Sequence, residues 1–237
     1  MNFRVRGFNE CLIMYILAAA SPTHGVPAKV YHEGWAENGA IVKPHTAENL
    51  PMNLRYQTGS IGPLFWAHYS FLGLDPNGLK DQYANYFDEM KNYTLANRAY
   101  CIRNPKNYKG YGENCWGLTA SYSVKGYAAH APNEKEDHGV ISPTAALSSI
   151  VYTPEESMDV MKYLYQKKNK TWGEYGFYDA FSETENWYPQ QYLAIDQGPV
   201  AVMIENYRSQ LLWKLFMQHP DVRKGLRKLG FLSLIHI

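Results

Sequence analysis

Ten consecutive apolar residues, from Cys11 to Ala20, constrain the fold of this chain more than any other stretch. A helix built from them is apolar around its whole circumference and not along one stripe, so protein should surround it. One carboxylate, Glu10, stands where the run begins. The stretch therefore predicts an inner helix of a helical barrel, with an acid at the rim of a cleft.

The same stretch also resembles a secretory signal peptide. Arg4 and Arg6 precede the apolar run, and three alanines before Ser21 imitate a cleavage site. Against this, the charged Glu10 abuts the run, and the run is too short to span a membrane. The residues alone leave both interpretations open.

The composition of the chain indicates which kinds of binding partner to expect. The net charge of +1 and the lack of a basic run give no electrostatic footprint for nucleic acid or an anionic membrane, so we expect a neutral partner. Aromatic residues make up 15% of the chain, with 20 Tyr and 6 Trp, and their flat faces suit sugar rings as well as a core. The three cysteines form no CxxC pair and argue against a disulfide framework or zinc site. We expect neither a metal nor a cofactor.

Wholly apolar segments alternate with amphipathic ones along the rest of the chain, which is typical of two concentric helical layers. Thr153 and Glu156 predict a capping box at the start of one amphipathic helix. Residues 40–62 have the Pro and Gly content of a long loop, parts of which could pair as a hairpin. We expect inner helices at 11–20, 63–74 and 198–207, and outer helices at 80–102, 154–167 and 220–230.

Five stretches carry a resemblance to a known family: RVRGFNECLIMYILAAASPTHG, GPLFWAHYSFLGLDPNGLKD, NRAYCIRNPKNYKGYGENCWGLTASYS, GVISPTAALSSIVYTPEESM and the aromatic-rich segment WGEYGFYDAFSETENWYPQQYLAIDQGPVAVMIENYRSQLLWKLF. They closely resemble the bacterial glycoamylase-like family, which includes endo-β-1,2-glucanases and the glycosidase-like domain of cyclic glucan synthases. The resemblance runs from about Asn2 to Phe231 and implies an all-α fold, an (α/α)6 toroid of six helical hairpins with a sugar cleft at one end. It places residues 11–20 inside a domain, which favours the inner helix over the signal peptide.

The N-terminal part of the family domain has no counterpart in this sequence. We therefore expect residues 1–231 to be an incomplete C-terminal portion of a glycoamylase-like catalytic domain, with an exposed apolar patch on the inner helices. Residues 232–237, LSLIHI, depart from the helical pattern, and we expect them to be a non-native tail. The family suggests a periplasmic or secreted location.

The resemblance also implies an inverting glycoside hydrolase. Such an enzyme needs one carboxylic acid to protonate the leaving oxygen and one carboxylate to activate water, usually about 6.5 to 9.5 Å apart. Glu10, in the matching FNEC motif, is the candidate acid; alternatively it stabilises a helix start behind an Asn9 cap. Asp196 is the candidate base; alternatively it is a cap or Asx turn. Glu113 ranks next, as catalytic support or as a partner for sugar hydroxyls.

Substrate contacts are expected from aromatic faces and from side chains that bond hydroxyls. The candidate stacking faces are Trp116, Trp66, Trp187 and Tyr188, although Trp66 could instead belong to the core. The candidate hydroxyl partners are His68, Asn114 and Gln197. Asp179, Glu183 and Glu185 rank lower, because acids in such a loop are usually solvated.

The expected function is hydrolysis of a neutral β-glucan, with β-1,2 linkages favoured. Two alternatives stay open: a carbohydrate-binding or scaffolding protein without activity, and a glucan-processing domain of a larger cyclic glucan synthase. The sequence predicts no stable membrane span, and it does not fix the oligomeric state.

Overall fold

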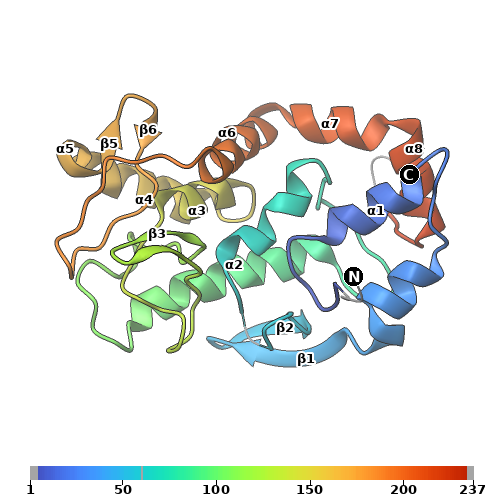
Figure 1. Ribbon diagram of the computed structural model, residues 1–237, viewed down its shortest axis with the longest axis horizontal. Helices are drawn as coiled ribbons and strands as arrows, with labels where there is room; N and C mark the ends of the chain where they lie inside the picture. Colours follow the sequence, from blue (N-terminus) through green and yellow to red (C-terminus); the bar gives the residue numbers. More distant parts are fainter. Residues whose placement is uncertain (1–4, 60, 234–237) are drawn as a thin grey trace.

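The structure is a computed structural model that describes residues 5–59 and 61–233. Helices dominate this part of the chain, and the named strands form three short antiparallel pairs (Figure 1). The all-α class agrees with the prediction, while the complete toroid stays a prediction. Of the expected tail, Leu232 pairs through its backbone with Lys80, and residues 234–237 lie outside the described part.

The longer helices are α1 (Leu12–Ala20), α2 (Tyr86–Arg103), α3 (Pro143–Ser148), α4 (Pro154–Gln166), α5 (Lys168–Thr171), α6 (Ala194–Ser209), α7 (Leu211–Gln218) and α8 (Pro220–Lys228). Short 3-10 or π turns are η1 (Val30–Trp35), η2 (Glu37–Gly39), η3 (Leu64–Ala67), η4 (Tyr69–Leu72) and η5 (Ser149–Val151). The strand pairs are β1 (Val42–Ala47) with β2 (Leu50–Leu54), β3 (Ser121–Ser123) with β4 (Gly126–Ala128), and β5 (Trp172–Gly173) with β6 (Gly176–Phe177).

Helix α1 forms where the apolar run predicts it, but protein covers only part of its circumference. Ile16 is fully buried, whereas Met14 and Leu17 are 44% and 46% exposed. The covered side lies against α8, where a Cβ atom on Gly225 would stand 2.8 Å from the Ile16 carbonyl oxygen. The glycine thus permits the close approach of the two helices. The prediction that protein surrounds the helix was wrong for its exposed side.

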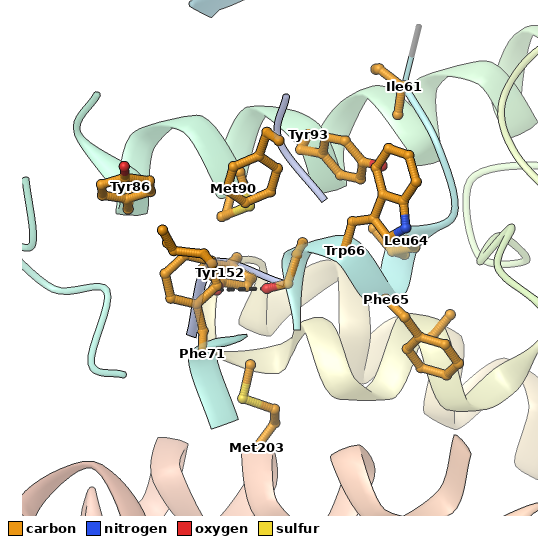
Figure 2. Close-up of a cluster of buried hydrophobic side chains, with 14 of the residues drawn as sticks. Ile61, Leu64, Phe65, Trp66, Phe71, Tyr86, Met90, Tyr93, Tyr152 and Met203 are labelled. Carbon is orange, nitrogen blue, oxygen red and sulfur yellow. Dashed lines mark hydrogen bonds between the residues drawn. The ribbon is translucent and has the colours of Figure 1, made fainter. Parts of the chain in front are cut away.

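The buried segment 63–74 is not the continuous helix that the sequence predicts. It forms η3 and η4, which meet at His68 with φ −114° and ψ −54°. Its carbonyl groups accept hydrogen bonds from side chains of other elements: Ala67 from the Tyr152 hydroxyl at 2.8 Å, and Phe71 from the Trp213 ring N–H at 2.7 Å. Tertiary donors thus replace part of the helical ladder. Figure 2 shows the surrounding cluster, in which Met90 and Tyr93 of α2 face η3 from one side and Met203 lies on the side of α6.

Helix α2 is more enclosed than the outer helix that we expected. It contacts β2 on one side and η3 on another, and half of its residues are buried. The β1–β2 pair confirms the hairpin option for residues 40–62 and lies along α2 in Figure 1. The buried Glu89 fastens the hairpin to α2, because its carboxylate accepts hydrogen bonds from the Asn53 and Leu54 N–H groups and from the Tyr56 hydroxyl.

Helices α4 and α8 confirm the two amphipathic helices that the sequence predicts for 154–167 and 220–230. The capping box was wrong, since the Thr153 hydroxyl contacts the Ser149 carbonyl and the Ser157 hydroxyl and caps no N–H group of α4. Helix α6 forms as expected but buries only one stripe, and Ile195 on its other side is 62% exposed.

Helices α1, α6, α7 and α8 border an apolar groove of about 650 Å³. Leu17, Val202 and Phe216 line it, and so does Leu215, which is 62% exposed. Of these residues, Leu17 lies on α1 and Val202 on α6, two of the helices expected to carry an apolar patch, and the origin of that patch in missing hairpins stays a prediction. Among the described residues, no helix combines the length and the apolar character needed to cross a bilayer.

Candidate active site

Two adjacent residues, Tyr69 and Ser70, connect the beginnings of α1 and α6. The Ser70 hydroxyl donates a hydrogen bond to the Glu10 carbonyl at 2.6 Å and accepts one from the Ile13 N–H at 3.1 Å. The Tyr69 hydroxyl donates to the Ile195 carbonyl at 3.2 Å. Neighbouring Cα atoms lie about 3.8 Å apart, so η4 brings two helix starts from opposite ends of the chain to one region.

The electrostatics place the candidate acids in this same region. Burial raises the pKa of Tyr69, and the charges of Asp196, Glu10 and Asp179 raise it further. The pKa of Tyr127 is raised by burial and by the same three carboxyl groups. Tyr127 is 57% exposed, so the region opens to solvent on this side. Tyr69 and Tyr127 thus both feel the charges of the same three carboxyl groups.

Glu10 lies in the turn before α1 and is partly exposed. Its Oε2 atom is buried without a hydrogen-bond partner among the described residues. The side chain of Asn9, and not that of Glu10, accepts a hydrogen bond from the Cys11 N–H, at 2.7 Å. Asn9 thus bonds the backbone at the start of α1 as the helix-stabilising alternative expects, while Glu10 itself lies before the first turn, so both interpretations of Glu10 stay predictions.

Asp196 lies in the first turn of α6 and is completely buried. Neither of its carboxyl oxygens meets an N–H or O–H donor in the described part of the chain. A cap or Asx turn requires such a bond to the backbone, so that alternative finds no support. Burial, followed by the neighbouring Asp179, raises the pKa of Asp196 to about 8.

Asp179 is not the solvated loop acid that the sequence predicts. It is completely buried, its Oδ2 atom accepts the Tyr122 N–H at 3.0 Å, and burial raises its pKa. The surrounding loop is fixed, because Ile141 and Phe181 exchange two backbone hydrogen bonds of 2.9 Å. The apolar neighbours Ala180 and Phe181 are the sequence signal that this stretch is not a solvated loop.

Glu113 and Asn114 lie on the surface of the molecule. The Glu113 side chain is 75% exposed and pairs with Arg98 at 3.2 Å. Glu113 is not among the charges that act on Tyr69 or Tyr127. The structure therefore gives Glu113 a surface ion pair and does not bring it to Asp196.

Three predicted binding residues belong to the core, and for them the prediction needs correction. Trp116 and His68 are completely buried, and Trp66 is 9% exposed. The Trp66 ring covers Gly62, where a Cβ atom would stand 2.6 Å from it. His68 contacts the Ser149 hydroxyl through Nε2 at 2.9 Å, and burial lowers its pKa to about 3. Because these side chains are buried in the core, none of them can offer a face to a sugar.

The other predicted binding residues flank the Asp179 loop. Trp187 and Tyr188 are partly exposed, and Tyr188 stacks on Phe181 with ring centroids 5.8 Å apart. Gln197 donates from Nε2 to the Phe177 carbonyl at 2.9 Å, which ties the start of α6 to β6. Trp187 and Tyr188 stay candidates for sugar contact, whereas Gln197 has a structural partner.

Among the described residues, no cluster of three or more His, Cys, Asp or Glu side chains could hold a metal ion.

Comparisons with known proteins identify the family. The Glycoamylase family model, which carries the description "putative glucoamylase", matches residues 2–220. A solved structure with this same description, from Bacteroides fragilis, superposes with a TM-score of 0.97 at 74% identity, over 98% of this chain and 56% of that one. An endo-β-1,2-glucanase from Chitinophaga pinensis, in complex with sophorotriose and glucose, gives a TM-score of 0.96 at 66% identity, over 98% and 56%.

A curated relative from Parabacteroides distasonis, an exo β-1,2-glucooligosaccharide sophorohydrolase (non-reducing end), is 42% identical over 97% of this chain and 34% of its own length. The chain thus spans about a third of this curated relative and about half of the solved ones. The extent of the family match and the level of identity confirm the resemblance: the chain belongs to the Glycoamylase family.

Proposed function

We propose that this chain forms part of a glycoside hydrolase that cleaves β-1,2-linked glucan with inversion. The observation that carries the proposal is that the adjacent residues Tyr69 and Ser70 bond the backbone at Ile195 and Glu10, which brings Glu10 and the residue beside Asp196 to one region from two distant helices. Two of the similar proteins are named as hydrolases of β-1,2-linked glucans or oligosaccharides, which supports the choice of linkage.

In this proposal Glu10 is the general acid and Asp196 the general base. Glu10 gives its proton to the glycosidic oxygen while the bond from that oxygen to the anomeric carbon breaks. On the opposite face of the sugar, Asp196 takes a proton from water, and the water oxygen bonds to the anomeric carbon. A base works best when its pKa lies near the working pH, and the raised pKa of Asp196 fits this requirement.

A reducing-sugar assay of the full-length gene product on β-1,2-glucan, laminarin and starch tests the function. We expect turnover of β-1,2-glucan, with the α-anomer appearing first in the proton NMR spectrum of the products. Preference for laminarin would keep the enzyme class and change the linkage, and retention of the anomer would overturn the inverting mechanism. Binding of glucan without any turnover would favour the carbohydrate-binding alternative.

A further inference from the structure

We propose that a pocket at the tip of the β3–β4 hairpin is a second carbohydrate-binding site, which holds a stretch of the glucan chain outside the candidate active site. This inference rests on the proposed function, because it names a further contact of the same substrate. The pocket has a volume of about 420 Å³, within the range of about 300–1,000 Å³ that is usual for small-molecule sites. Lys125, His138 and Glu185 line it together with Tyr108.

The pocket adjoins the candidate active site but lies on another face of the hairpin. The Tyr122 N–H donates to the Asp179 Oδ2 atom at 3.0 Å, and Ser123, the next residue, lines the pocket. Tyr122 pairs with Tyr127, and Ser123 with Gly126, in the antiparallel register. Since side chains alternate between the faces of a strand, the two tyrosines lie on one face and Ser123 on the other. Only a glucan chain long enough to pass the hairpin can therefore reach both sites.

Hydrogen bonds hold the wall of the pocket that Tyr108 forms. The Tyr108 hydroxyl donates to the Asp137 carbonyl at 3.3 Å, and the Gly139 N–H donates to the Asp137 carboxylate at 3.1 Å. Gly139 has φ +72°, and a Cβ atom there would stand 2.7 Å from the Tyr108 ring. The glycine thus lets the ring lie directly against residues 138–140, so this wall is formed before a ligand binds.

The loop that carries Glu185 is tied to the same wall. The residue after Tyr108 is Lys109, and its N–H donates to the hydroxyl of Thr184 at 2.9 Å. The Glu185 N–H donates to the Ser182 hydroxyl at 3.3 Å, which fixes the backbone on the other side of Thr184. These bonds hold Glu185 and Tyr108 at one pocket, although the two residues are distant in the chain.

The charges of the lining favour a neutral ligand that is rich in hydroxyl groups. Lys125 and Glu185 carry opposite charges, and neither makes an ion pair with another described residue. An anion would meet the Glu185 carboxylate and a cation the Lys125 ammonium group, so either charge would be repelled. A sugar hydroxyl can donate to the carboxylate and accept from the ammonium group. The Tyr108 ring adds an aromatic face of the kind that suits a sugar ring.

The first test compares two substrates of different length, with the full-length gene product. The double variant Lys125→Ala/Glu185→Ala removes both charged groups. We expect its kcat/KM to fall about 10-fold more on β-1,2-glucan than on sophorotriose, since the short substrate cannot occupy both sites at once. The matched control Glu134→Ala/Lys135→Ala removes the same two charges from exposed residues outside the pocket lining. An unchanged ratio in the Lys125 and Glu185 variant, or an equal change in the control, would overturn the proposal.

A second measurement does not depend on turnover. In the full-length Asp196→Asn protein with labelled Ala and Val methyl groups, we expect the NMR signals of Ala128 and Val124 to shift when β-1,2-linked glucooligosaccharides are added. The shifts should disappear when Lys125→Ala and Glu185→Ala are introduced. Shifts confined to residues outside the pocket would end the proposal even if the enzyme is active. Shifts at the pocket in a protein without glucan turnover would keep the second site and remove the proposed function.

Discussion

Glu89 and Asp196 are both almost completely buried acids, yet their surroundings are opposite. The Glu89 carboxylate accepts hydrogen bonds from two backbone N–H groups and a tyrosine hydroxyl, so it braces the hairpin against α2. Asp196 has no such donor among the described residues, and burial, followed by the neighbouring Asp179, raises its pKa to about 8. A buried charge without donors is costly to keep. The difference shows that Glu89 serves the fold, and it is the reason why we propose a chemical role for Asp196.

The strongest test of this contrast is Asp196→Asn. Asparagine has nearly the same shape but cannot take a proton from water, so we expect turnover of β-1,2-glucan to fall by about 10³-fold, within the range for acid–base groups. Calorimetric titration with a β-1,2-linked oligosaccharide should show that binding is retained. The control is Asp159→Asn on α4, whose side chain is 51% exposed and should leave turnover unchanged. Full activity of Asp196→Asn would remove it from the mechanism.

The Glu10→Gln variant tests the other half of the pair. Glutamine keeps the side-chain length and the backbone contact with Ser70 but has no acidic proton, and we expect turnover to fall by about 10²-fold. A substrate with a better leaving group needs less protonation, so its rate should fall less. Equal losses for both substrates would assign Glu10 to binding or folding and not to proton donation.

The sequence alone could identify some of these acids as candidate site residues and not others. The apolar run at 11–20 predicts α1 correctly, because a helix depends on the local sequence pattern. Glu10 and Asp196 could be chosen as candidates because they lie in stretches that match the family. Asp179 could not be chosen in this way. Its burial depends on backbone bonds to Tyr122 and Gln191, which are distant in the chain.

The errors at Trp116 and His68, and the core position of Trp66 that the sequence left open, have a related cause. An aromatic residue in an apolar segment can either face a ligand or fill the core, and only the packing of other elements decides between them. The break at His68 within 63–74 likewise depends on donors from Tyr152 and Trp213, which a local helical pattern does not reveal.

Glu89→Gln tests the structural side of the contrast. The amide N–H₂ group would face backbone N–H donors, so we expect the free energy of unfolding to fall by about 1–3 kcal/mol in urea denaturation. Turnover per folded molecule should stay the same. The neighbouring Asp88→Asn is the matched control, since Asp88 is exposed and bonds only locally to Asn85 at 2.6 Å. Loss of turnover in a stably folded Glu89→Gln protein would break the distinction between the two acids.

The smallest effect is expected for Tyr69→Phe, which removes one hydroxyl from the link between the two helix starts. The phenyl ring keeps its packing against Phe65, and the Ile195 carbonyl that loses its donor belongs to an exposed residue, so water can replace the hydroxyl. We expect kcat/KM to fall by about 2- to 10-fold, the equivalent of one ordinary hydrogen bond. Tyr207→Phe on the exposed side of α6 should change nothing. A loss as large as that of Asp196→Asn would mean that the Tyr69 hydroxyl takes part in the reaction, and the chemical role would then extend from the buried acids to the tyrosine between them.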